Sequence, residues 1–319
     1  MNNSPDNRQK YKYLFGPVPS RRLGLSLGID LVTPKTCSYD CLFCEVGRTT
    51  AMTVERKEYV PAGDILAEFA DWHGRGGNAD YITLAGSGEP TLHSRFGFII
   101  KELRRMSSIK TALFTNGSML HMPDVRRDAA FADVAKVSLS AWDDRSYGLI
   151  NRPHPALGFE DVVLGIGAFR SEFKGELWLE VFVLAGVNDN ERDIGRIAAI
   201  TKGFHADKIH LNTVARPPAD KSAVAVDGAR LKKLAELFSP EAEVIAGFAS
   251  GIKCARAISD AEVLAMIARR PCTARDVADA FGVETEATQE TLNGMLQNGQ
   301  VTSERRGKDV YFLVAPTSR

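Results

Sequence analysis

Short apolar, β-branched segments alternate along this 319-residue chain with segments of helical period. The strand-like segments are Leu25–Val32, Tyr81–Ala85, Lys110–Phe114, Val134–Leu139, Leu177–Leu184 and Lys208–Leu211. The helix-like segments between them include Asp64–Trp72, Phe96–Met106, Phe159–Phe169, Glu191–Thr201 and Asp227–Phe238. Such alternation is typical of a parallel sheet covered by crossover helices. Six units are fewer than the eight of a closed barrel, so we predict an α/β fold with an open, partial (β/α)6 barrel.

The pattern changes after about residue 258. Three helical segments, Asp260–Arg270, Thr273–Phe281 and Glu286–Gln297, precede a hairpin-like segment, Val301–Val314. Three helices followed by a hairpin in so short a stretch predict a winged helix-turn-helix. We therefore expect a disordered polar N-terminus over 1–11, a barrel over 12–257 and a winged-helix domain over 258–319.

Composition excludes several classes of protein. Lys+Arg and Asp+Glu both number 40, so the whole chain has no bulk attraction to nucleic acid or to an anionic membrane. No run of 18 apolar residues is present, and Met1–Lys10 lacks the layout of a secretory signal. Three of the five cysteines crowd into eight positions, which is unlike a secreted disulfide framework. We expect a cytoplasmic protein with a metal site.

That metal site is indicated by the spacing Cys37-x3-Cys41-x2-Cys44. Soft thiolates in a tight loop suit iron–sulfur clusters or zinc. A structural zinc site takes four ligands, whereas Cys254 and Cys272 stand far away in sequence. Three thiolates on a four-iron cluster leave one iron open to a small molecule. From spacing alone, a zinc site completed by a distant His and three buried structural cysteines are the other interpretations.

The string CSYDCLFC over 37–44 resembles the cluster loop of the radical S-adenosylmethionine (SAM) superfamily. That family has CxxxCxxC with an aromatic residue before the last cysteine, here Phe43. The resemblance implies a [4Fe–4S] cluster on Cys37, Cys41 and Cys44. It also implies that SAM chelates the open iron through its amino and carboxylate groups, with Phe43 near the adenine.

A second motif supports the same resemblance. Gly86–Pro90, with the sequence GSGEP, follows a predicted strand and resembles the family's GGEP motif, with Ser87 replacing one glycine. Glycines let the backbone approach a ligand closely, and a carboxylate can pair with an ammonium group. By itself the segment also fits an ordinary turn between strand and helix. The resemblance implies that Gly86, Ser87, Gly88 and Glu89 contact the methionine part of SAM.

Small polar residues end three further strands, where parallel α/β proteins place ligands. The resemblance implies that they contact the ribose or carboxylate of SAM, although each also fits a helix cap. They are Asn116, Ser138, Ser140 and Asn212. Ser138 and Ser140 share one face in the period-2 alternation. Glu180 is a lone carboxylate in an apolar strand, and a buried acid must be paired or functional.

Arginines beside prolines are candidates for binding an anionic substrate, because a rigid loop presents the guanidinium. Arg152 precedes Pro153-His154, Arg216 precedes Pro217-Pro218, and Arg21 and Arg22 precede the first predicted strand. His154 is a candidate proton donor. The possible substrate residues are therefore Arg21, Arg22, Arg152, His154 and Arg216.

Four further segments carry a narrower resemblance: Phe15–Gly24, Gly86–Glu89, Asn151–His154 and Leu211–Pro218. Together with the cluster loop, they resemble Fe–S oxidoreductases related to the wyosine tRNA synthase, over most of residues 12–250. That enzyme carries a second cluster on its own cysteines, and this chain has no second cysteine triplet. Zero net charge also fits a tRNA substrate poorly.

The C-terminal module has an unusual charge pattern for a DNA reader. The segment in the position of a recognition helix, Glu284–Gln300, contains three glutamates and no Lys or Arg, whereas the wing carries Arg305, Arg306 and Lys308. Phosphates would be repelled by such a helix, so we expect a protein contact in preference to duplex DNA.

The family resemblance implies a mechanism. The enzyme would reductively cleave SAM at a [4Fe–4S] cluster, and the resulting 5′-deoxyadenosyl radical would abstract hydrogen from a substrate that the sequence does not identify. An electron donor of the ferredoxin or flavodoxin type is implied. The alternatives are an activase acting on a partner protein, a wyosine-type enzyme acting on RNA, and a non-enzymatic Fe–S redox sensor that binds DNA.

Overall fold

An eight-stranded sheet forms the centre of the computed structural model, which describes residues 11–20, 22–245, 260–269, 271–281, 283–306 and 308–315. Its strand order is β1-β2-β5-β6-β7-β8-β9-β10, and all neighbours are parallel except β1 and β2. The strands are β1 Leu14–Ser20, β2 Gly24–Ile29, β5 Tyr81–Leu84, β6 Lys110–Thr115, β7 Val134–Ser138, β8 Glu176–Phe182, β9 Lys208–Asn212 and β10 Glu243–Val244. The mostly parallel sheet confirms the α/β part of the predicted fold class and is consistent with a partial barrel.

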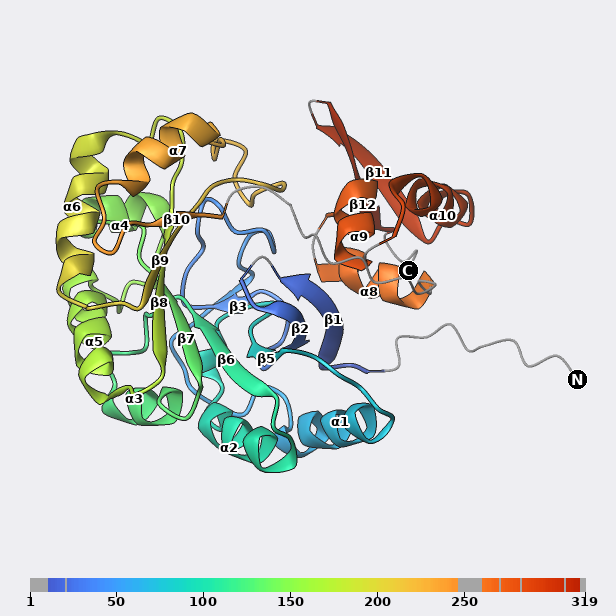
Figure 1. Cartoon of the computed structure of the whole chain (residues 1–319), viewed down its shortest axis with the longest axis horizontal. Helices are drawn as coiled ribbons and strands as arrows, with labels where there is room; N and C mark the ends of the chain where they lie inside the picture. The colour runs from blue at the N-terminus through green and yellow to red at the C-terminus, as the bar shows by residue number, and fades with distance from the viewer. Residues whose placement is uncertain are drawn as a thin grey trace, which may run out of the picture.

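Helices cover the outer side of the curved sheet (Figure 1). They are α1 Ala62–Gly74, α2 Phe96–Met106, α3 Pro123–Ala129, α4 Asp144–Ile150, α5 Phe159–Glu172, α6 Glu191–Lys202 and α7 Gly228–Ala235, with the short 3-10 helix η1 Pro90–Leu92. Each predicted strand and helix of the barrel overlaps one of these elements. The sequence patterns missed β1, because Pro17 and Pro19 interrupt its pattern. A strand at the sheet edge tolerates proline, since its outer amide groups need no partner strand.

The two faces of the sheet have different chemistry. Alternate residues such as Val137, Leu179 and Leu211 are fully buried in the main apolar core, together with helix residues such as Ile166 and Ile197. The intervening strand residues point to the concave face, because successive side chains alternate. On β7, β8 and β9 they include charged and polar groups.

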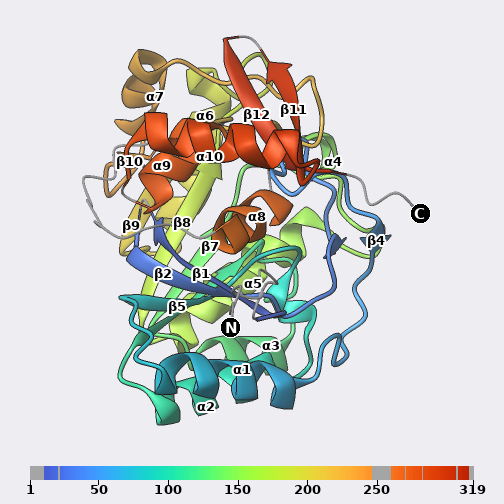
Figure 2. The same cartoon turned by 90° about the vertical axis from the view of Figure 1, so that its right-hand side faces the viewer.

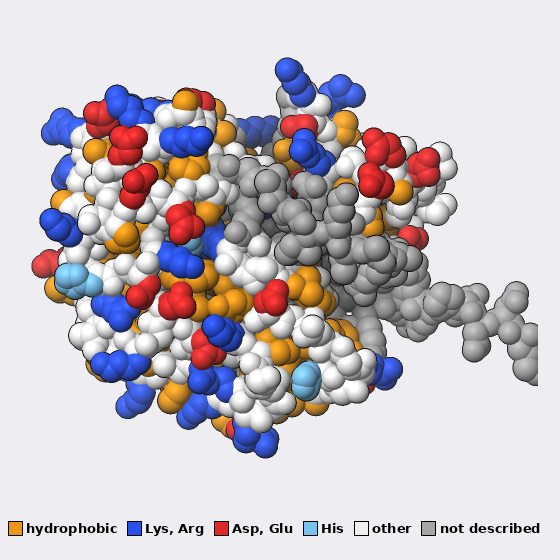
Figure 3. Space-filling view, in the orientation of Figure 1, with side chains coloured by type: hydrophobic (Ala, Val, Ile, Leu, Met, Phe, Trp, Pro, Cys, Tyr) orange, Lys and Arg blue, Asp and Glu red, His pale blue; other side chains and the backbone are white. Residues whose placement is uncertain are grey.

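A second group of elements follows the barrel: α8 Asp260–Arg269, α9 Ala274–Phe281, α10 Thr285–Gln297, β11 Val301–Arg306 and β12 Asp309–Val314. They have a separate apolar core that contains Cys272, Leu292 and Phe312. Cys272 is fully buried there. Figure 3 shows acidic side chains over α10 and basic ones on the β11–β12 hairpin.

The C-terminal elements lie beside the N-terminal edge of the sheet, where α8 and α9 contact β1 (Figures 1 and 2). The expected boundary near residue 257 and Cys254 fall outside the described residues, as does the predicted disordered N-terminus except Tyr11. The Tyr11 hydroxyl donates to Asp71 Oδ2 at 2.7 Å. Among the described helices, none has the length and apolar character needed to cross a bilayer.

Candidate active site

The three clustered cysteines lie on one loop beyond β2. The loop begins at the short strand β3 (Thr36–Cys37), which pairs in parallel with β4 (Ala51–Met52). Cys37, Cys41 and Cys44 are free and half-buried. Each sulfur accepts hydrogen bonds from nitrogen donors, which stabilise the thiolate form and any iron bound to it.

The donors differ from sulfur to sulfur. Cys37 Sγ receives the backbone N–H groups of Ser38 and Tyr39 and lies 3.6 Å from Asn116 Nδ2. Asn151 Nδ2 lies 3.5 Å from Cys41 Sγ. Cys44 Sγ accepts hydrogen bonds from the backbone N–H groups of Val46 and Gly47. Asn151, which directly follows α4, is thus a site residue that the sequence patterns missed.

Burial raises the pKa of all three thiols, and repulsion between neighbouring sulfurs adds to the effect on Cys37 and Cys41. The pKa of Cys37 rises to about 12. Without metal, the thiols would stay protonated at neutral pH, and iron would displace those protons on binding.

The three sulfurs are a donor set that suits an iron–sulfur cluster. No three His, Cys, Asp or Glu side chains in the described ranges converge closely enough to hold one metal ion. A four-iron cluster binds each thiolate at a different iron, so its ligands need not converge on one point. Three soft sulfurs with nitrogen donors around them therefore fit a [4Fe–4S] cluster.

The Gly86–Pro90 turn packs directly on the start of the cysteine loop. Lys35 N donates to Ser87 O at 2.7 Å, and Glu89 N donates to Thr36 O at 3.1 Å. A Cβ atom on Gly88 would lie only 1.9 Å from Thr36 O. The glycine therefore lets two protein loops approach each other, whereas the sequence motif predicted that it lets the backbone approach a ligand.

Gly86, two residues earlier in the same turn, also allows a close contact within the protein. Its φ is +117°, and a Cβ atom there would lie 1.8 Å from Asp30 Oδ1. The same Asp30 oxygen accepts from Ser87 N at 2.8 Å. Gly86 is thus required for the contact that joins the turn to the end of β2.

Glu89 is buried and joins the ends of two strands. Its Oε1 accepts from Thr91 N at 3.1 Å, Thr91 Oγ1 at 2.6 Å and Thr115 Oγ1 at 2.6 Å, and its Oε2 accepts from Asn116 N at 2.8 Å. Burial raises its pKa, while these donors act in the opposite direction. The two threonines were not selected from the sequence, where no local signal connects Thr115 with a carboxylate 26 residues earlier.

The four polar strand-end residues do not converge on one point. Asn116 Nδ2 donates to Ser38 Oγ at 2.9 Å, beside the cysteine loop. Ser140 Oγ instead accepts from Phe182 N at 2.9 Å and braces the end of β8. Ser138 and Asn212 face a group of charges on the concave side of the sheet.

We name that group the inner charge cluster: Arg22, Lys136, Glu180, His210 and Asn212. Arg22 forms an ion pair with Glu180 Oε1, and Lys136 Nζ lies 2.7 Å from Glu180 Oε2. Asn212 Nδ2 donates to Glu180 Oε1 at 3.1 Å. Burial, followed by the nearby Arg22, lowers the pKa of His210 to about 4, so its imidazole is neutral at physiological pH. The lone carboxylate seen in the sequence is therefore paired.

Phe43 connects the cysteine loop to this face of the sheet. Its ring stacks on Phe182, with centroids 4.1 Å apart and planes at 9°. Leu42, Ile150 and Leu184 complete the apolar group around the pair. Phe182 points to the same face as Glu180, two residues earlier on β8.

The segment 151–154 supports the cysteine loop. Asp40 N lies 3.1 Å from both Asn151 O and Arg152 O, and His154 N donates to Ser38 O at 2.8 Å. The Arg152 side chain pairs with Asp220 at 2.7 Å. The side chain of His154 accepts from the backbone N–H of Ala156 at 3.2 Å.

Arg216 lies at a contact between the two parts of the molecule. Its side chain is 2% exposed, with one nitrogen 3.0 Å from Glu45 Oε2 and another 3.7 Å from Asp276 Oδ1 on α9. It therefore bridges the residue after Cys44 and the C-terminal elements. Arg21 lies outside the described residues.

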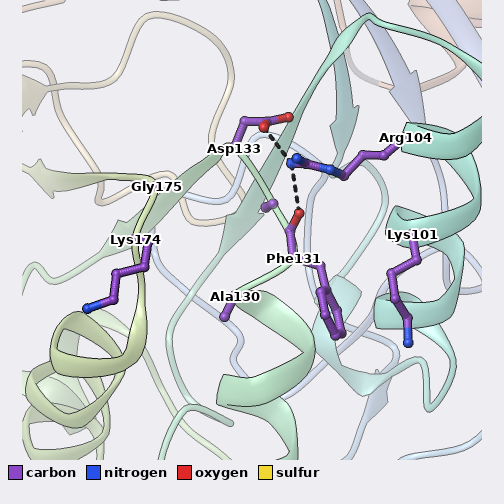
Figure 4. A pocket seen from close by; sticks show the side chains of 8 residues that line it. Lys101, Arg104, Ala130, Phe131, Asp133, Lys174 and Gly175 are labelled. Carbon is purple, nitrogen blue, oxygen red and sulfur yellow. Dashed lines mark hydrogen bonds and ion pairs between the residues drawn. The ribbon is translucent and has the colours of Figure 1, made fainter.

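A separate pocket of about 440 Å³ lies at the amino ends of β7 and β8 (Figure 4). Arg104 spans it and donates to Phe131 O at 3.1 Å and to Asp133. The cysteine loop follows the carboxyl end of β2, so this pocket belongs to the opposite end of the parallel sheet.

Known proteins similar to this chain indicate the same kind of site as the cysteine loop. The family described as the radical SAM superfamily matches residues 31–197, just over half of the chain. A UPF0026 protein of Helicobacter pylori is 30% identical over 311 residues, covering 94% of this chain and 96% of that one. A crystal structure of a radical SAM methyltransferase from Sphaerobacter thermophilus aligns with a TM-score of 0.55 and 15% identity, covering 71% of this chain and 67% of that one. At that identity the likeness concerns the fold alone.

Two further relatives match this chain over only part of their own length. A protein of Brachyspira hyodysenteriae named GTPase Obg is 32% identical over 306 residues, which cover 95% of this chain and 45% of that protein. A UPF0026 protein of Methanocaldococcus jannaschii is 39% identical over 209 residues, which cover 65% of each chain. The chain thus spans less than two thirds of the length of these two relatives. It belongs to the radical SAM superfamily, whose members use a [4Fe–4S] cluster and S-adenosylmethionine.

Proposed function

We propose that this protein is a radical SAM enzyme that binds its [4Fe–4S] cluster through Cys37, Cys41 and Cys44. The main support is the geometry of the cysteine loop, in which three free thiols accept nitrogen donors beside a tightly packed glycine turn. When bound, the cluster would supply the one electron that cleaves SAM into methionine and a 5′-deoxyadenosyl radical. That radical is the species that takes a hydrogen atom from the substrate.

The residues around the loop would orient SAM. Gly86–Glu89 lies against the loop, with Glu89 held rigid by its four hydrogen bonds, so its position is set before the ligand binds. We assign Gly86, Ser87, Gly88 and Glu89 to the methionine part. Asn116, which contacts the loop, and Ser140 are the candidates for the carboxylate of SAM, and Ser138 and Asn212 are the candidates for its ribose.

Water exclusion is the second contribution of the chain. The stacked Phe43 and Phe182 present apolar surface next to the cysteine loop, in a group that also holds Leu42 and Leu184. A dry site protects a reactive radical from side reactions. An electron donor of the ferredoxin or flavodoxin type would reduce the cluster.

For the C-terminal part we propose a winged-helix domain over 258–319 that follows a barrel over 12–257. Three exposed glutamates lie on α10 or at its N-cap: Glu284, Glu286 and Glu290. Arg305 on the hairpin is also exposed. An acidic helix is repelled by phosphates, which favours a protein partner or a protein substrate over duplex DNA.

The test is anaerobic reconstitution of the full chain, followed by iron and zinc analysis and by measurement of 5′-deoxyadenosine after addition of SAM and a strong reductant. We expect about four irons per chain and slow 5′-deoxyadenosine release. Cys41→Ala should abolish both, whereas Cys272→Ala, which removes a cysteine from the separate C-terminal core, should keep both. Zinc in place of iron, or a complete cluster that never cleaves SAM, would overturn the proposal and favour the redox sensor.

A further inference from the structure

The inner charge cluster contains more positive than negative charge. Arg22 and Lys136 share the single carboxylate of Glu180, and His210 is neutral. Two other charged residues lie at its margin. Lys208 stacks over Trp178 at 4.6 Å, and Glu243, whose side chain is 65% exposed, lies 4.0 Å from His210 Nε2. Counted over the residues that the structure describes, the buried part of the cluster therefore carries an excess of one positive charge.

Two buried nitrogen atoms of the cluster have no hydrogen-bond partner among the described residues: Arg22 Nε and His210 Nδ1. Buried donors are normally paired, and an unpaired one costs free energy. Uncompensated charge in a protein interior is costlier still. A bound anion would satisfy both requirements, since it neutralises the excess charge and accepts hydrogen bonds from the guanidinium.

Part of the cluster is exposed, and the cluster shares its strand face with Phe182, which contacts the cysteine loop. About a tenth of the Arg22 and Lys136 side chains is exposed, at 10% and 11%. Both cations lie over the ring of Phe114, at 6.0 and 4.9 Å from its centroid. Glu180 is two residues before Phe182, hence about 7 Å below the ring on which Phe43 stacks. A group bound at the cluster would extend toward the cysteine loop.

We propose that the inner charge cluster is a binding subsite for a carboxylate of the substrate, held by Arg22 and Lys136. The proposal rests on the proposed function and adds the substrate class. A monoanion neutralises the excess of one charge, whereas a phosphate dianion would leave a net negative charge in the interior. Glu180 already occupies one carboxylate position between these two cations, which shows that their spacing suits that group.

The experiment uses the reconstituted full-length protein with the cluster oxidised, titrated with [1-13C]acetate at constant ionic strength in chloride. Carbon-13 line width measures binding. We expect saturable broadening. Lys136→Met and Arg22→Gln should each weaken acetate binding about tenfold or more, because each removes a charged hydrogen-bond donor. Lys174→Met, at the opposite end of the sheet, is the matched control and should leave binding unchanged.

Glu180→Gln gives the decisive result. It removes the internal carboxylate that competes for the two cations, so it should strengthen acetate binding several-fold. A purely structural charge network predicts no such gain. Equal acetate binding in the wild type, Lys136→Met and Glu180→Gln would overturn the subsite. Tighter binding of methylphosphonate than of acetate would overturn the choice of carboxylate.

The same preparations separate this proposal from the proposed function. 5′-Deoxyadenosine formation tests the enzyme, and acetate binding tests the subsite without any turnover. A protein that cleaves SAM but shows no saturable acetate binding contradicts the subsite alone. A protein that binds acetate at Arg22 and Lys136 but never cleaves SAM contradicts the enzyme assignment, and with it the role of this carboxylate site in substrate binding.

Discussion

Neighbouring residues on β8 have opposite environments. Leu179 and Val181 point outward into an apolar core and are fully buried among helix side chains. Glu180 and Phe182, the intervening residues, point to the concave face, where one binds two cations and the other stacks on the cysteine loop. A single strand therefore supplies both the packing that holds the sheet and the chemistry that lines its concave side. The two faces should respond differently to substitution.

The largest expected effect is on the outer face. Leu179→Ala should lower the free energy of unfolding by about 2–5 kcal/mol, because it leaves a cavity where a fully buried side chain stood. Urea denaturation of the full chain measures the change. Acetate binding and iron content of the protein that remains folded should match the wild type. A loss below 1 kcal/mol would mean that the outer face is less tightly packed than the burial indicates.

The second effect concerns pH and the concave face. His210, 2% exposed, has a pKa of about 4 in the folded protein instead of the usual 6.5. Below pH 6.5 the His210 imidazole binds a proton in the unfolded chain but stays neutral in the folded protein. The stability that is present above that pH is therefore lost as the pH falls toward 4. The loss should be roughly 3 kcal/mol.

Unfolding free energies measured between pH 7 and pH 4 test this prediction. His210→Gln should remove the His210 part of the slope. Burial also lowers the pKa of His93 in the same direction, and this residue remains in the variant. Only the difference between the two proteins therefore belongs to His210. An identical pH dependence in both would contradict a neutral buried imidazole.

A smaller effect is expected from adding a methyl group to the concave face of β2. A Cβ on Gly28 would lie 2.0 Å from the ring of Phe15, so Gly28→Ala should cost about 1–3 kcal/mol by overpacking. Thermal unfolding compares it with Gly63→Ala in α1, where no atom lies within 4 Å of the added carbon. That control should be neutral or slightly stabilising. Equal melting temperatures would show that the Phe15 ring moves freely.

The smallest effect is predicted for Ser138→Ala. Lys136 Nζ donates to Ser138 Oγ at 3.3 Å but also holds Glu180 at 2.7 Å, so the ammonium keeps its main partner. The free energy of unfolding should fall by less than about 1 kcal/mol. A larger loss in denaturant titration would indicate that the serine has a greater part in holding Lys136 than its distance suggests.

Much of the barrel could be predicted from local patterns. The periods of strand and helix are carried by neighbouring residues, so segments such as Phe96–Met106 were located correctly from the sequence. The sequence patterns missed β1 and the short helices α3 and α4. Edge prolines weaken the pattern of β1, and seven residues give α3 and α4 too few turns for a clear period.

The environment of the site was less predictable. The cysteine loop and the Gly86–Pro90 turn were found as separate motifs, but their packing through Thr36 and Ser87 was not. Arg216 stood beside prolines as a candidate substrate contact, and the folded chain buries it between Glu45 and Asp276. Pairing between such distant charges depends on how whole segments pack, which no local spacing records.

The sequence by itself determined the spacing of the three cysteines, the glycines of the turn, the alternation of the two strand faces and membership of the superfamily. These properties depend on residues close together in the chain. Only the tertiary structure decided the partners of the buried polar groups. Glu180 meets Arg22 from 158 residues away and Lys136 from 44, because strand register and the N-terminal edge place them on one concave face. A buried charge takes whichever partner the packing brings within reach, and that choice is a property of the folded chain.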